Sequence, residues 1–368
     1  MKILQLIQKQ QLRGAEIFAS QLSAHLSEKG NTVILVNLFG GDAALPFDGQ
    51  TTTLNGNQKA RLHDVAGWRK LAQIIRDENP DVIQANAGDT LKYAVFSKIF
   101  FRWKQPIVFR NASTISLYVK TLPQRIWNGF LFRFTDKIIS VSNTSANDFM
   151  QTFPGQKHKV ITIPIGIEHV EFAAARNVKT NGRALLNGDG GIRIIHVGGF
   201  TFEKNHIELI DIFDLILKRT QSAYLYLVGD GPLKAEIEEL VRKRGLSSRV
   251  KFCGFQKNAM DYIRSADVLV LPSIIEGLPG VILEAFYCRT PVVAYNVGGI
   301  REIVRHKETG RLIAQGDKTA FATAVIEATS DSPQNQKIIS NAHDLVISDY
   351  LNREVVKKFV SAYESLVI

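Results

Sequence analysis

The chain has 368 residues, a hydrophobic content of 45% and a formal net charge of +10. This length is enough for two ordinary domains, and the composition is that of a globular protein. No apolar run is long enough to span a membrane, and the N-terminus is expected not to be a secretory signal because its apolar run is short. Only two cysteines are present, Cys253 and Cys288, so a disulfide framework and a cysteine-only zinc cluster are excluded, and a cytoplasmic location is expected.

The positive charge is concentrated in the first half of the chain. Residues 1–170 hold 20 Lys and Arg against 12 Asp and Glu, whereas the remaining residues hold 25 against 23. This asymmetry predicts an anionic partner for the N-terminal half, either nucleic acid or an anionic membrane. An ordinary solubilising surface is the alternative explanation. Nucleic acid is the weakest of these readings, because the basic residues are scattered and match no nucleic-acid-binding motif.

The first half of the chain alternates between apolar strands and amphipathic helices. Strands are expected at 2–7, 32–38, 81–86, 106–111 and 136–142, and helices at 14–30 and 68–80. Near-continuous apolar strands separated by helices are typical of a parallel sheet that is covered on both faces. The sequence therefore predicts a Rossmann-like domain over residues 1–168.

A second alternating region follows a stretch rich in Gly and Asn, which we interpret as a linker over 169–191. Strands are expected at 192–197, 223–229, 249–254, 267–272 and 291–295, and helices at 206–219, 232–244, 257–265 and 280–288. This region predicts a second Rossmann-like domain over 192–348, followed by a C-terminal helical segment over 349–368. The predicted fold class is α/β, with two doubly wound domains facing across a cleft and functional residues just after the strands.

Glycines follow several of the predicted strands and can bring backbone close to a ligand. Gly14 opens the first helix, where a helix N-terminus can receive an anion. Neither the G-x-G-x-x-G dinucleotide pattern nor a P-loop is present, which argues against a nicotinamide dehydrogenase and a P-loop ATPase. In the second half, Gly198 and Gly199 form a turn, and Lys204 lies just outside a helix whose N-cap is expected at Asn205. A bound phosphate would explain a cation at that position, although an exposed lysine is the commoner case.

Two further positions after strands are candidates for contact with a nucleotide. Gly229 lies in the turn that follows the strand at 223–229, before Pro232, the expected first residue of a helix. Phe255 follows the strand at 249–254 and could pack against a flat base. Each of these features alone is also typical of an ordinary turn.

The most informative stretch is "SIIEGLPGVILEAF", which places Glu276 and Glu284 eight residues apart. Between them, the loop of Gly277, Leu278 and Pro279 leads into a helix that begins near Gly280. The free N–H groups of that helix suit a diphosphate, and each flanking carboxylate suits the hydroxyls of a sugar or ribose. A solvent-facing turn with a helix-end charge is the simpler alternative. Because such features follow successive strands, we interpret them together as a sugar-nucleotide site.

These residues resemble the family 4 glycosyltransferases, which have the GT-B fold. The resemblance rests on "EGLPGVILEAF", "PVVAYNVGGIREIV", "GGFTFEKNH", "LVGDGPL", "DKIISVS" and "IPIGIE", and it covers nearly the whole chain. It implies a retaining hexosyltransferase that needs neither metal nor cofactor and whose C-terminal domain holds the sugar nucleotide, most often UDP-linked and next GDP-linked. It implies that Lys204 neutralises the leaving diphosphate, that Glu276 contacts the transferred sugar and that Glu284 contacts the ribose. It also implies that the C-terminal helix returns to the N-terminal domain.

The chain departs from the family pattern at several positions. Gly199 stands where an arginine often lies beside the phosphate. Gln84, Asn86 and Asn111 stand where many members have histidines, so no imidazole base is expected there. The family's "PNG" turn reads Pro164-Ile165-Gly166. The acceptor side has therefore diverged more than the donor side.

The reaction expected from this resemblance moves a sugar from a nucleoside diphosphate to a hydroxyl of a glycan or lipid-linked acceptor. Lys204, the helix N-terminus near Gly280 and the turn at Gly14 would stabilise the departing charge, with Arg13 as a second cation. The implied front-face route needs no separate base, because the leaving phosphate oxygen helps to take the acceptor proton. A double displacement would need a carboxylate nucleophile, for which Asp89 is the candidate in the N-terminal half. A sugar-nucleotide epimerase and a non-catalytic sugar-nucleotide binding protein are the alternatives.

Two basic, aromatic segments of the N-terminal half could contact an anionic bilayer. Residues 91–106 and 118–134 contain Trp103 and Trp127, either of which could lie at the membrane interface. The same segments could equally be helices packed on the sheet. The first reading predicts a peripheral enzyme at the inner face of the cytoplasmic membrane, acting in polysaccharide, lipopolysaccharide or glycolipid biosynthesis.

Overall fold

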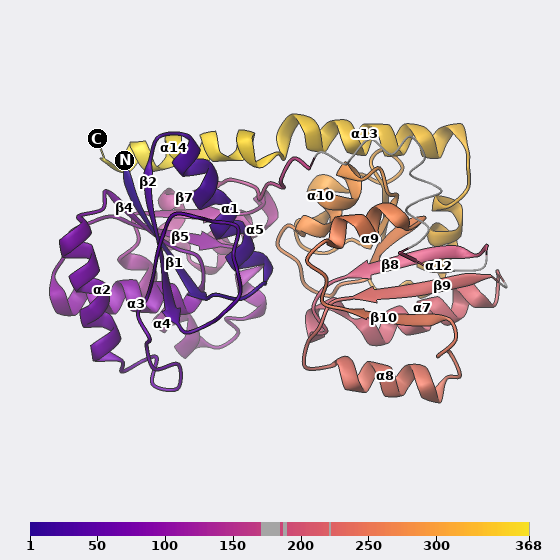
Figure 1. The fold of residues 1–368 in the computed structure, drawn as a ribbon, viewed down its shortest axis with the longest axis horizontal. Helices are drawn as coiled ribbons and strands as arrows, with labels where there is room; N and C mark the ends of the chain where they lie inside the picture. The colour runs from indigo at the N-terminus through magenta and orange to yellow at the C-terminus, as the bar shows by residue number, and fades with distance from the viewer. Residues whose placement is uncertain (171–184, 187–189, 221, 368) are drawn as a thin grey trace. The chain divides into compact units, whose positions relative to one another are not determined.

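The computed structural model describes residues 1–170, 185–186, 190–220 and 222–367 (Figure 1). The chain divides into two compact units: unit 1 is Met1–Glu168 with Leu351–Ile368, and unit 2 is His169–Tyr350. Each unit is built on one parallel sheet flanked by helices, which confirms the predicted fold class of two doubly wound α/β units. Most of the linker predicted at 169–191 lies outside the described residues.

Unit 1 contains a seven-stranded sheet in the order β3-β2-β1-β4-β5-β6-β7, with every pair parallel. Its strands are β1 (Lys2–Lys9), β2 (Thr32–Phe39), β3 (Gln50–Thr53), β4 (Val82–Ala85), β5 (Ile107–Asn111), β6 (Lys137–Ser140) and β7 (Val160–Thr162). Its helices are α1 (Gly14–Glu28), α2 (Val65–Glu78), α3 (Gly88–Phe101), α4 (Leu122–Arg133), α5 (Asn143–Thr152) and α14 (Asn352–Val367), with short 3₁₀ turns η1 (Ile115–Leu117) and η2 (Pro154–Lys159). The strand order reverses between β1 and β4, which is where open α/β sheets bind ligands.

Alternating strand residues of unit 1 feed two separate cores. On one face, Leu4 and Leu6 pack with residues of α2, α3, α4 and α5, including Trp68 and Phe132. On the other face, strand residues such as Ile3 pack with α1 and with α14, the yellow C-terminal helix in Figure 1. Both faces of the sheet are therefore covered, as near-continuous apolar strands require.

A buried polar network joins α14 to the sheet. The Tyr363 hydroxyl donates to Gln84 Oε1 at 2.5 Å and accepts from Gln5 Nε2 at 3.3 Å, while Asn86 Nδ2 donates to Gln5 Oε1 at 2.8 Å. All four side chains are buried. Gln84, which stands at a histidine position of the family pattern, therefore holds the C-terminal helix directly, and Asn86, at another such position, contributes through Gln5.

The chain segments at the two ends of unit 1 also meet. Ile167 forms a parallel bridge with Leu351, and Asn352 Nδ2 donates to Glu168 Oε1 at 2.6 Å. A Cβ on Gly166 would lie 2.5 Å from Asn352 Oδ1 and 3.0 Å from its backbone. The close approach of Asn352 therefore explains the glycine of the Pro-Ile-Gly turn.

Unit 2 contains a six-stranded parallel sheet in the order β10-β9-β8-β11-β12-β13. Its strands are β8 (Ile192–Val197), β9 (Ala223–Val228), β10 (Val250–Gly254), β11 (Val268–Leu271), β12 (Val292–Tyr295) and β13 (Arg311–Ile313). Its helices are α7 (His206–Leu217), α8 (Lys234–Lys243), α9 (Ala259–Ser265), α10 (Gly280–Tyr287), α11 (Ile300–Ile303), α12 (Lys318–Ala328) and α13 (Pro333–Asp349), with the 3₁₀ turn η4 (Phe202–Lys204). The order again reverses once, between β8 and β11, so the loops after these two strands should hold a ligand.

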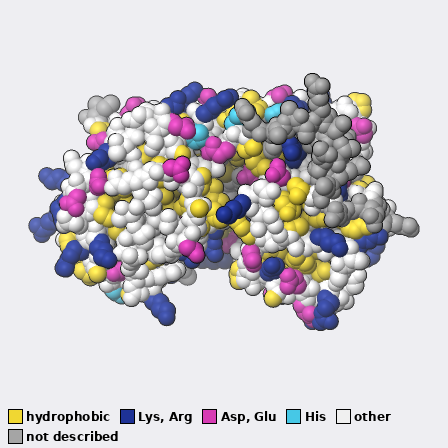
Figure 2. All heavy atoms as spheres, in the orientation of Figure 1, with side chains coloured by type: hydrophobic (Ala, Val, Ile, Leu, Met, Phe, Trp, Pro, Cys, Tyr) yellow, Lys and Arg dark blue, Asp and Glu magenta, His cyan; other side chains and the backbone are white. Residues whose placement is uncertain are grey.

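The surface of unit 1 mixes apolar and basic side chains. Figure 2 shows hydrophobic, Lys and Arg side chains interspersed with some Asp and Glu on the visible face of this unit. None of the helices within the described residues combines the length and apolar character needed to span a membrane.

Candidate active site

The two loops that leave β8 and β11 carry the best candidate site in unit 2. Lys204, at the end of η4, donates from Nζ to Glu276 Oε1 at 2.5 Å, and both side chains are largely withdrawn from solvent, with 21% and 10% exposed. The Ile274 N–H also donates to the Glu203 carbonyl at 2.8 Å. The structure therefore brings Lys204 and Glu276, which are 72 residues apart, into direct contact at the reversal point of the sheet.

Asn205 holds these loops together in a way that the sequence did not indicate. Asn205 is the N-cap residue of α7, as predicted, but its φ is 55° and its side chain makes no cap hydrogen bond. Instead, its Nδ2 donates to the Pro272 carbonyl at 3.2 Å and to Glu208 Oε2 at 2.8 Å. Asparagine tolerates this left-handed conformation better than most residues do. It positions Lys204 immediately before the helix.

Glycines at the strand ends allow the loops to pack tightly. Gly229 follows β9 with φ +144°, and a Cβ there would lie 2.0 Å from the Gly198 carbonyl oxygen. A Cβ on Gly198 would lie 3.3 Å from Lys204 Cε, so the lysine stem passes directly over this glycine. Gly199 is different, since a Cβ there would meet only ordinary contacts at 3.5 Å or more.

The loop that contains Glu276 is braced by a second glycine turn after β12. Gly298 has φ +53°, and a Cβ there would lie 1.9 Å from the Glu276 carbonyl oxygen. The Gly299 N–H donates to the Gly277 carbonyl at 2.9 Å. No role was predicted for Gly298, although a Gly-Gly pair after a strand is a signal of close backbone approach.

The helix α10 begins where the sequence predicted, at Gly280, with Pro279 in extended conformation at the N-cap position and no side-chain cap. Leu278, which precedes them in the loop, is buried. The Ile282 N–H already donates to the Pro279 carbonyl at 3.2 Å, and first-turn N–H groups without such a bond suit an anion.

Glu284 lies one turn into α10. The residue is partly exposed, but its carboxyl group is largely surrounded by protein atoms. Desolvation by burial raises the pKa of its carboxyl to about 7. In the part of the chain that the structure describes, its carboxylate has no hydrogen-bond partner. A desolvated carboxylate with unused acceptor oxygens suits ligand hydroxyls.

Two buried histidines next to Lys204 were missed from the sequence. The rings of His196, in β8, and His206, the first residue of α7, lie 4.7 Å apart, and Phe200 stacks on His206 at 4.2 Å. Burial lowers the pKa of His196 well below its usual value, and burial together with Lys204 lowers the pKa of His206 to about 4. Both rings are therefore neutral at pH 7 and leave Lys204 as the cation of this cluster.

The other candidates lie elsewhere. Phe255 follows β10, two strands away from β8 in the sheet, and 46% of its side chain is exposed. Gly14 opens α1 in unit 1 with open space where a Cβ would be, and Arg13 precedes it in extended conformation. The helix predicted from Pro232 begins only at Lys234, after a turn.

Asp89, the candidate nucleophile in unit 1, is engaged by three neighbours. Its carboxylate accepts from Gln8 Nε2 at 3.0 Å and from Lys92 Nζ at 2.9 Å, and Arg61 Nε lies 3.5 Å away. Asn111, another histidine position of the family pattern, donates to Ser140 Oγ at 3.2 Å. These groups are already committed within the unit.

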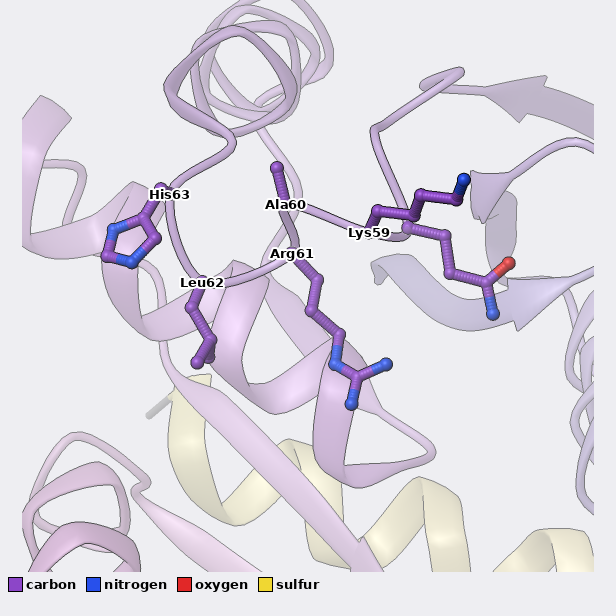
Figure 3. Close-up of a pocket in the computed structure, with 6 residues that line it drawn as sticks. Lys59, Ala60, Arg61, Leu62 and His63 are labelled. Carbon is purple, nitrogen blue, oxygen red and sulfur yellow. The ribbon is translucent and has the colours of Figure 1, made fainter.

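Arg61 belongs to a loop that forms a separate hollow in unit 1. Figure 3 shows side chains fanning out from this loop, which lines a cavity of about 550 Å³. The lining residues are Gln58, Lys59, Ala60, Arg61, Leu62 and His63. At the base of the loop, Asp64 accepts from the Tyr93 hydroxyl at 2.6 Å and from the Asn57 N–H at 2.8 Å. This hollow does not include the Lys204–Glu276 pair.

Across the described ranges, no group of three or more His, Cys, Asp or Glu side chains is arranged to hold a metal ion.

Two family models match consecutive parts of the chain. The model "Glycosyltransferase Family 4" matches residues 12–171, and the model "Glycosyl transferases group 1" matches residues 178–345. The chain belongs to the family 4 glycosyltransferases, as the motifs of its sequence predicted.

Individual relatives agree with this assignment. N-acetyl-alpha-D-glucosaminyl L-malate synthase of Bacillus anthracis is 31% identical over 170 residues, which are 46% of this chain and 44% of that protein. The amylovoran biosynthesis glycosyltransferase AmsD of Erwinia amylovora is 25% identical over 347 residues, which are 94% of each chain. In the first of these relatives the match spans less than half of the protein's length.

Solved structures show the same fold. The crystal structure of HepE from Anabaena in complex with UDP and glucose has a TM-score of 0.84 and 22% identity, and it covers 99% of this chain and 100% of its own. This likeness confirms the GT-B fold.

Proposed function

We propose that this protein is a retaining glycosyltransferase that moves a sugar from a nucleoside diphosphate to an acceptor hydroxyl. The observation that carries the proposal is the contact between Lys204 and Glu276 at the reversal point of the unit 2 sheet. A cation for a leaving phosphate and a carboxylate for sugar hydroxyls are the two groups that such a donor needs there. Family membership supports the same activity.

The proposed donor is a UDP-sugar, with a GDP-sugar as the next choice. The Anabaena protein HepE was crystallised with UDP and glucose, and it shares the fold of this chain. In the proposed complex, the diphosphate lies against the Gly198 turn and the N-terminus of α10, and Glu284 accepts hydrogen bonds from the ribose hydroxyls. Phe255 is proposed to contact the base.

The ion pair between Lys204 and Glu276 gives the proposed mechanism its first step. A bound diphosphate carries more negative charge than a carboxylate, so it draws the Lys204 ammonium toward itself. Glu276 is then available to accept a hydrogen bond from a hydroxyl of the transferred sugar. The neutral rings of His196 and His206 do not compete with Lys204 for the phosphate.

The proposed chemical step is a front-face displacement. The bond between the anomeric carbon and the diphosphate oxygen breaks, and the acceptor oxygen forms its bond on the same face of the sugar. The acceptor proton passes to the leaving phosphate, so no protein base is consumed. Lys204 stabilises the negative charge that develops on the diphosphate. The contacts of Asp89 with Gln8 and Lys92 argue against its use as a nucleophile.

The proposed acceptor is a hydroxyl of a glycan or of a lipid-linked glycan, and the proposed setting is polysaccharide, lipopolysaccharide or glycolipid biosynthesis. The name of the Erwinia amylovora relative places that protein in amylovoran biosynthesis. We further propose that the enzyme works without a metal or a cofactor and acts in the cytoplasm at the inner face of the membrane.

The test is a transfer assay with EDTA present, followed by NMR of the product. Incubation with UDP-sugars and with short glycan or lipid-linked acceptors should give a product whose anomeric configuration matches that of the donor. An inverted product would contradict retention. A donor converted to its epimer without transfer would instead identify an epimerase, and binding without turnover would identify a non-catalytic protein.

A further inference from the structure

Helix α4 of unit 1 exposes the apolar side that a helix normally buries. Leu122 and Ile126 are 69% and 66% exposed, and Trp127 and Phe130 are 39% and 37% exposed. Leu122, Ile126 and Phe130 are spaced by four residues, so they share one face of the helix. Within α4 only Leu131 and Phe132 are buried, because they alone reach the core under the sheet.

Neighbouring elements extend this apolar face. Ile99 and Phe100 at the end of α3, and Leu117 and Tyr118 at η1, are between 36% and 59% exposed. Aromatic rings connect three helices. The ring centroid of Phe100 in α3 lies 5.4 Å from that of Trp68 in α2. Phe96 of α3 stacks on Trp68 at 5.0 Å and lies 5.8 Å from Trp127 of α4. We call this the α3–α4 surface, and its residues are Ile99, Phe100, Leu117, Tyr118, Leu122, Ile126, Trp127 and Phe130. They are eight of the seventeen large hydrophobic residues exposed in the described ranges.

The chain segment that forms this surface carries charge of one sign, while a carboxylate of another element, Asp148 of α5, reaches its edge and accepts from the Ser116 N–H at 3.0 Å. Between Asp89 and Asp136 the sequence contains no acidic residue but eight Lys and Arg. The other residues of 1–170 hold 12 basic and 12 acidic side chains, so this segment carries the whole excess charge of the first half. Five of the eight are exposed on and beside the surface, namely Arg102, Lys104, Lys120, Arg125 and Arg133.

The structure also separates the two tryptophans that the sequence had placed at a membrane. Trp103 is buried, and its Nε1–H donates to Ser97 Oγ at 3.1 Å, so its assignment to the interface was wrong. Trp68 is buried as well, which leaves Trp127 as the exposed one of the three tryptophans of the chain. Most of α3 packs into the core, so α4 rather than α3 provides the main apolar face.

We propose that the α3–α4 surface docks unit 1 on an anionic lipid bilayer. Apolar side chains that enter the acyl boundary, an aromatic residue at the interface and exposed Lys and Arg from a segment without acidic residues are what an anionic bilayer recognises. A protein partner would normally present both signs of charge, and nothing in this segment would pair with its cations. The proposal deepens the proposed function, because a lipid-linked acceptor would then be reached at the membrane. Vesicle binding itself needs no turnover.

The test is co-sedimentation of the full chain with vesicles, read alongside tryptophan fluorescence. Vesicles of neutral phosphatidylcholine are compared with vesicles that contain about a third phosphatidylglycerol, at low and at high salt. We expect binding only to the anionic vesicles, more than tenfold weaker at high salt, with a blue shift of the emission that Trp127→Phe abolishes.

Matched variants separate the surface from general charge or hydrophobicity. The double variant Leu122→Ser/Ile126→Ser should lose binding at least tenfold, and Arg125→Gln/Arg133→Gln should lose roughly 25-fold, about fivefold per charge. The controls are Ile347→Ser in α13 and Arg242→Gln/Lys243→Gln in α8, exposed positions of unit 2 that should change binding less than twofold. Because all of these positions are exposed, the variants should fold.

Several results would overturn the proposal. The protein could stay in the supernatant with anionic vesicles at low salt, or bind neutral vesicles equally well. The control variants could also lose as much vesicle binding as the variants of the α3–α4 surface. Retention by nucleic acid but not by vesicles would overturn it in favour of a different partner. Turnover of the sugar nucleotide, measured on the same samples, tests the proposed function independently of vesicle binding.

Discussion

Gly298 provides a test of the site that does not touch a proposed catalytic side chain. The residue adopts φ +53°, and a Cβ on it would lie 1.9 Å from the carbonyl oxygen of Glu276. Real Cβ atoms essentially never approach closer than 3.0 Å, so Gly298→Ala requires the Glu276 backbone to retreat by about 1.1 Å. The carboxylate that contacts Lys204 would move with it.

The expected magnitude follows from two contributions. Alanine in the left-handed region costs about 1–2 kcal/mol of folding free energy. A displacement of about 1 Å at a catalytic group costs roughly 100-fold in rate, or about 2.7 kcal/mol of transition-state stabilisation. The matched control is Gly245→Ala, because Gly245 has φ +69° and open space where its Cβ would be.

The assay measures kcat/KM for donor turnover together with the thermal unfolding midpoint of both variants. Both should lose the stability that the left-handed conformation costs, Gly298→Ala should lose more because its Cβ meets backbone, and only Gly298→Ala should lose about 100-fold in kcat/KM. If both variants kept full turnover, or both lost it equally, the coupling between the Gly298 turn and the Glu276 loop would be refuted.

Three further predictions address other parts of the structure. Burial raises the pKa of Glu284 from 4.5 to about 7, so the free energy of unfolding should decrease as pH rises through this window. Glu284→Gln should remove this dependence of the free energy of unfolding on pH in urea titrations. An unchanged dependence would contradict the desolvation of Glu284. Tyr363→Phe removes the hydroxyl that bonds to Gln84 and Gln5 in the core, so the free energy of unfolding should fall by about 1–3 kcal/mol. An unchanged urea midpoint would count against the network. Gly199→Arg should be tolerated, because a Cβ there meets only the Asp230 carbonyl oxygen at 3.5 Å and the Thr201 methyl at 3.7 Å; a lowered melting temperature would contradict this, and faster donor turnover is expected from the added cation.

Most of the fold could be predicted from the sequence because its strands are apolar and its helices are periodic. The strand β3 was missed because its residues, Gln50–Thr53, are polar and lie at the edge of the sheet, where one side of the strand stays in water. The start of α8 was misplaced by two residues because Pro232 is compatible with both a turn and a first helical residue. These are cases in which local sequence permits two conformations and tertiary packing chooses between them.

The site was predicted less completely than the fold. The chain order of loops after strands was enough to single out Lys204 and Glu276, which the structure places in contact. The roles of His206 and the left-handed Asn205 depend on which loops meet in space, and no local pattern reports that; for Gly298 the Gly-Gly pair signals a close approach but not the loop that it approaches. Similarly, the spacing of apolar residues in α4 could not predict whether its apolar face is exposed or buried, because both cases give the same sequence pattern.

The central claim is that the Lys204–Glu276 cluster binds a sugar nucleotide and stabilises its leaving diphosphate. The most direct test measures binding and turnover of UDP-, GDP-, ADP- and dTDP-sugars with EDTA present, for the natural chain, for Lys204→Ala and for the exposed control Lys218→Ala. We expect one nucleotide to bind, and its turnover to fall 10²- to 10³-fold in Lys204→Ala while Lys218→Ala stays within twofold. Absence of binding to every sugar nucleotide, or full turnover in Lys204→Ala, would contradict the account.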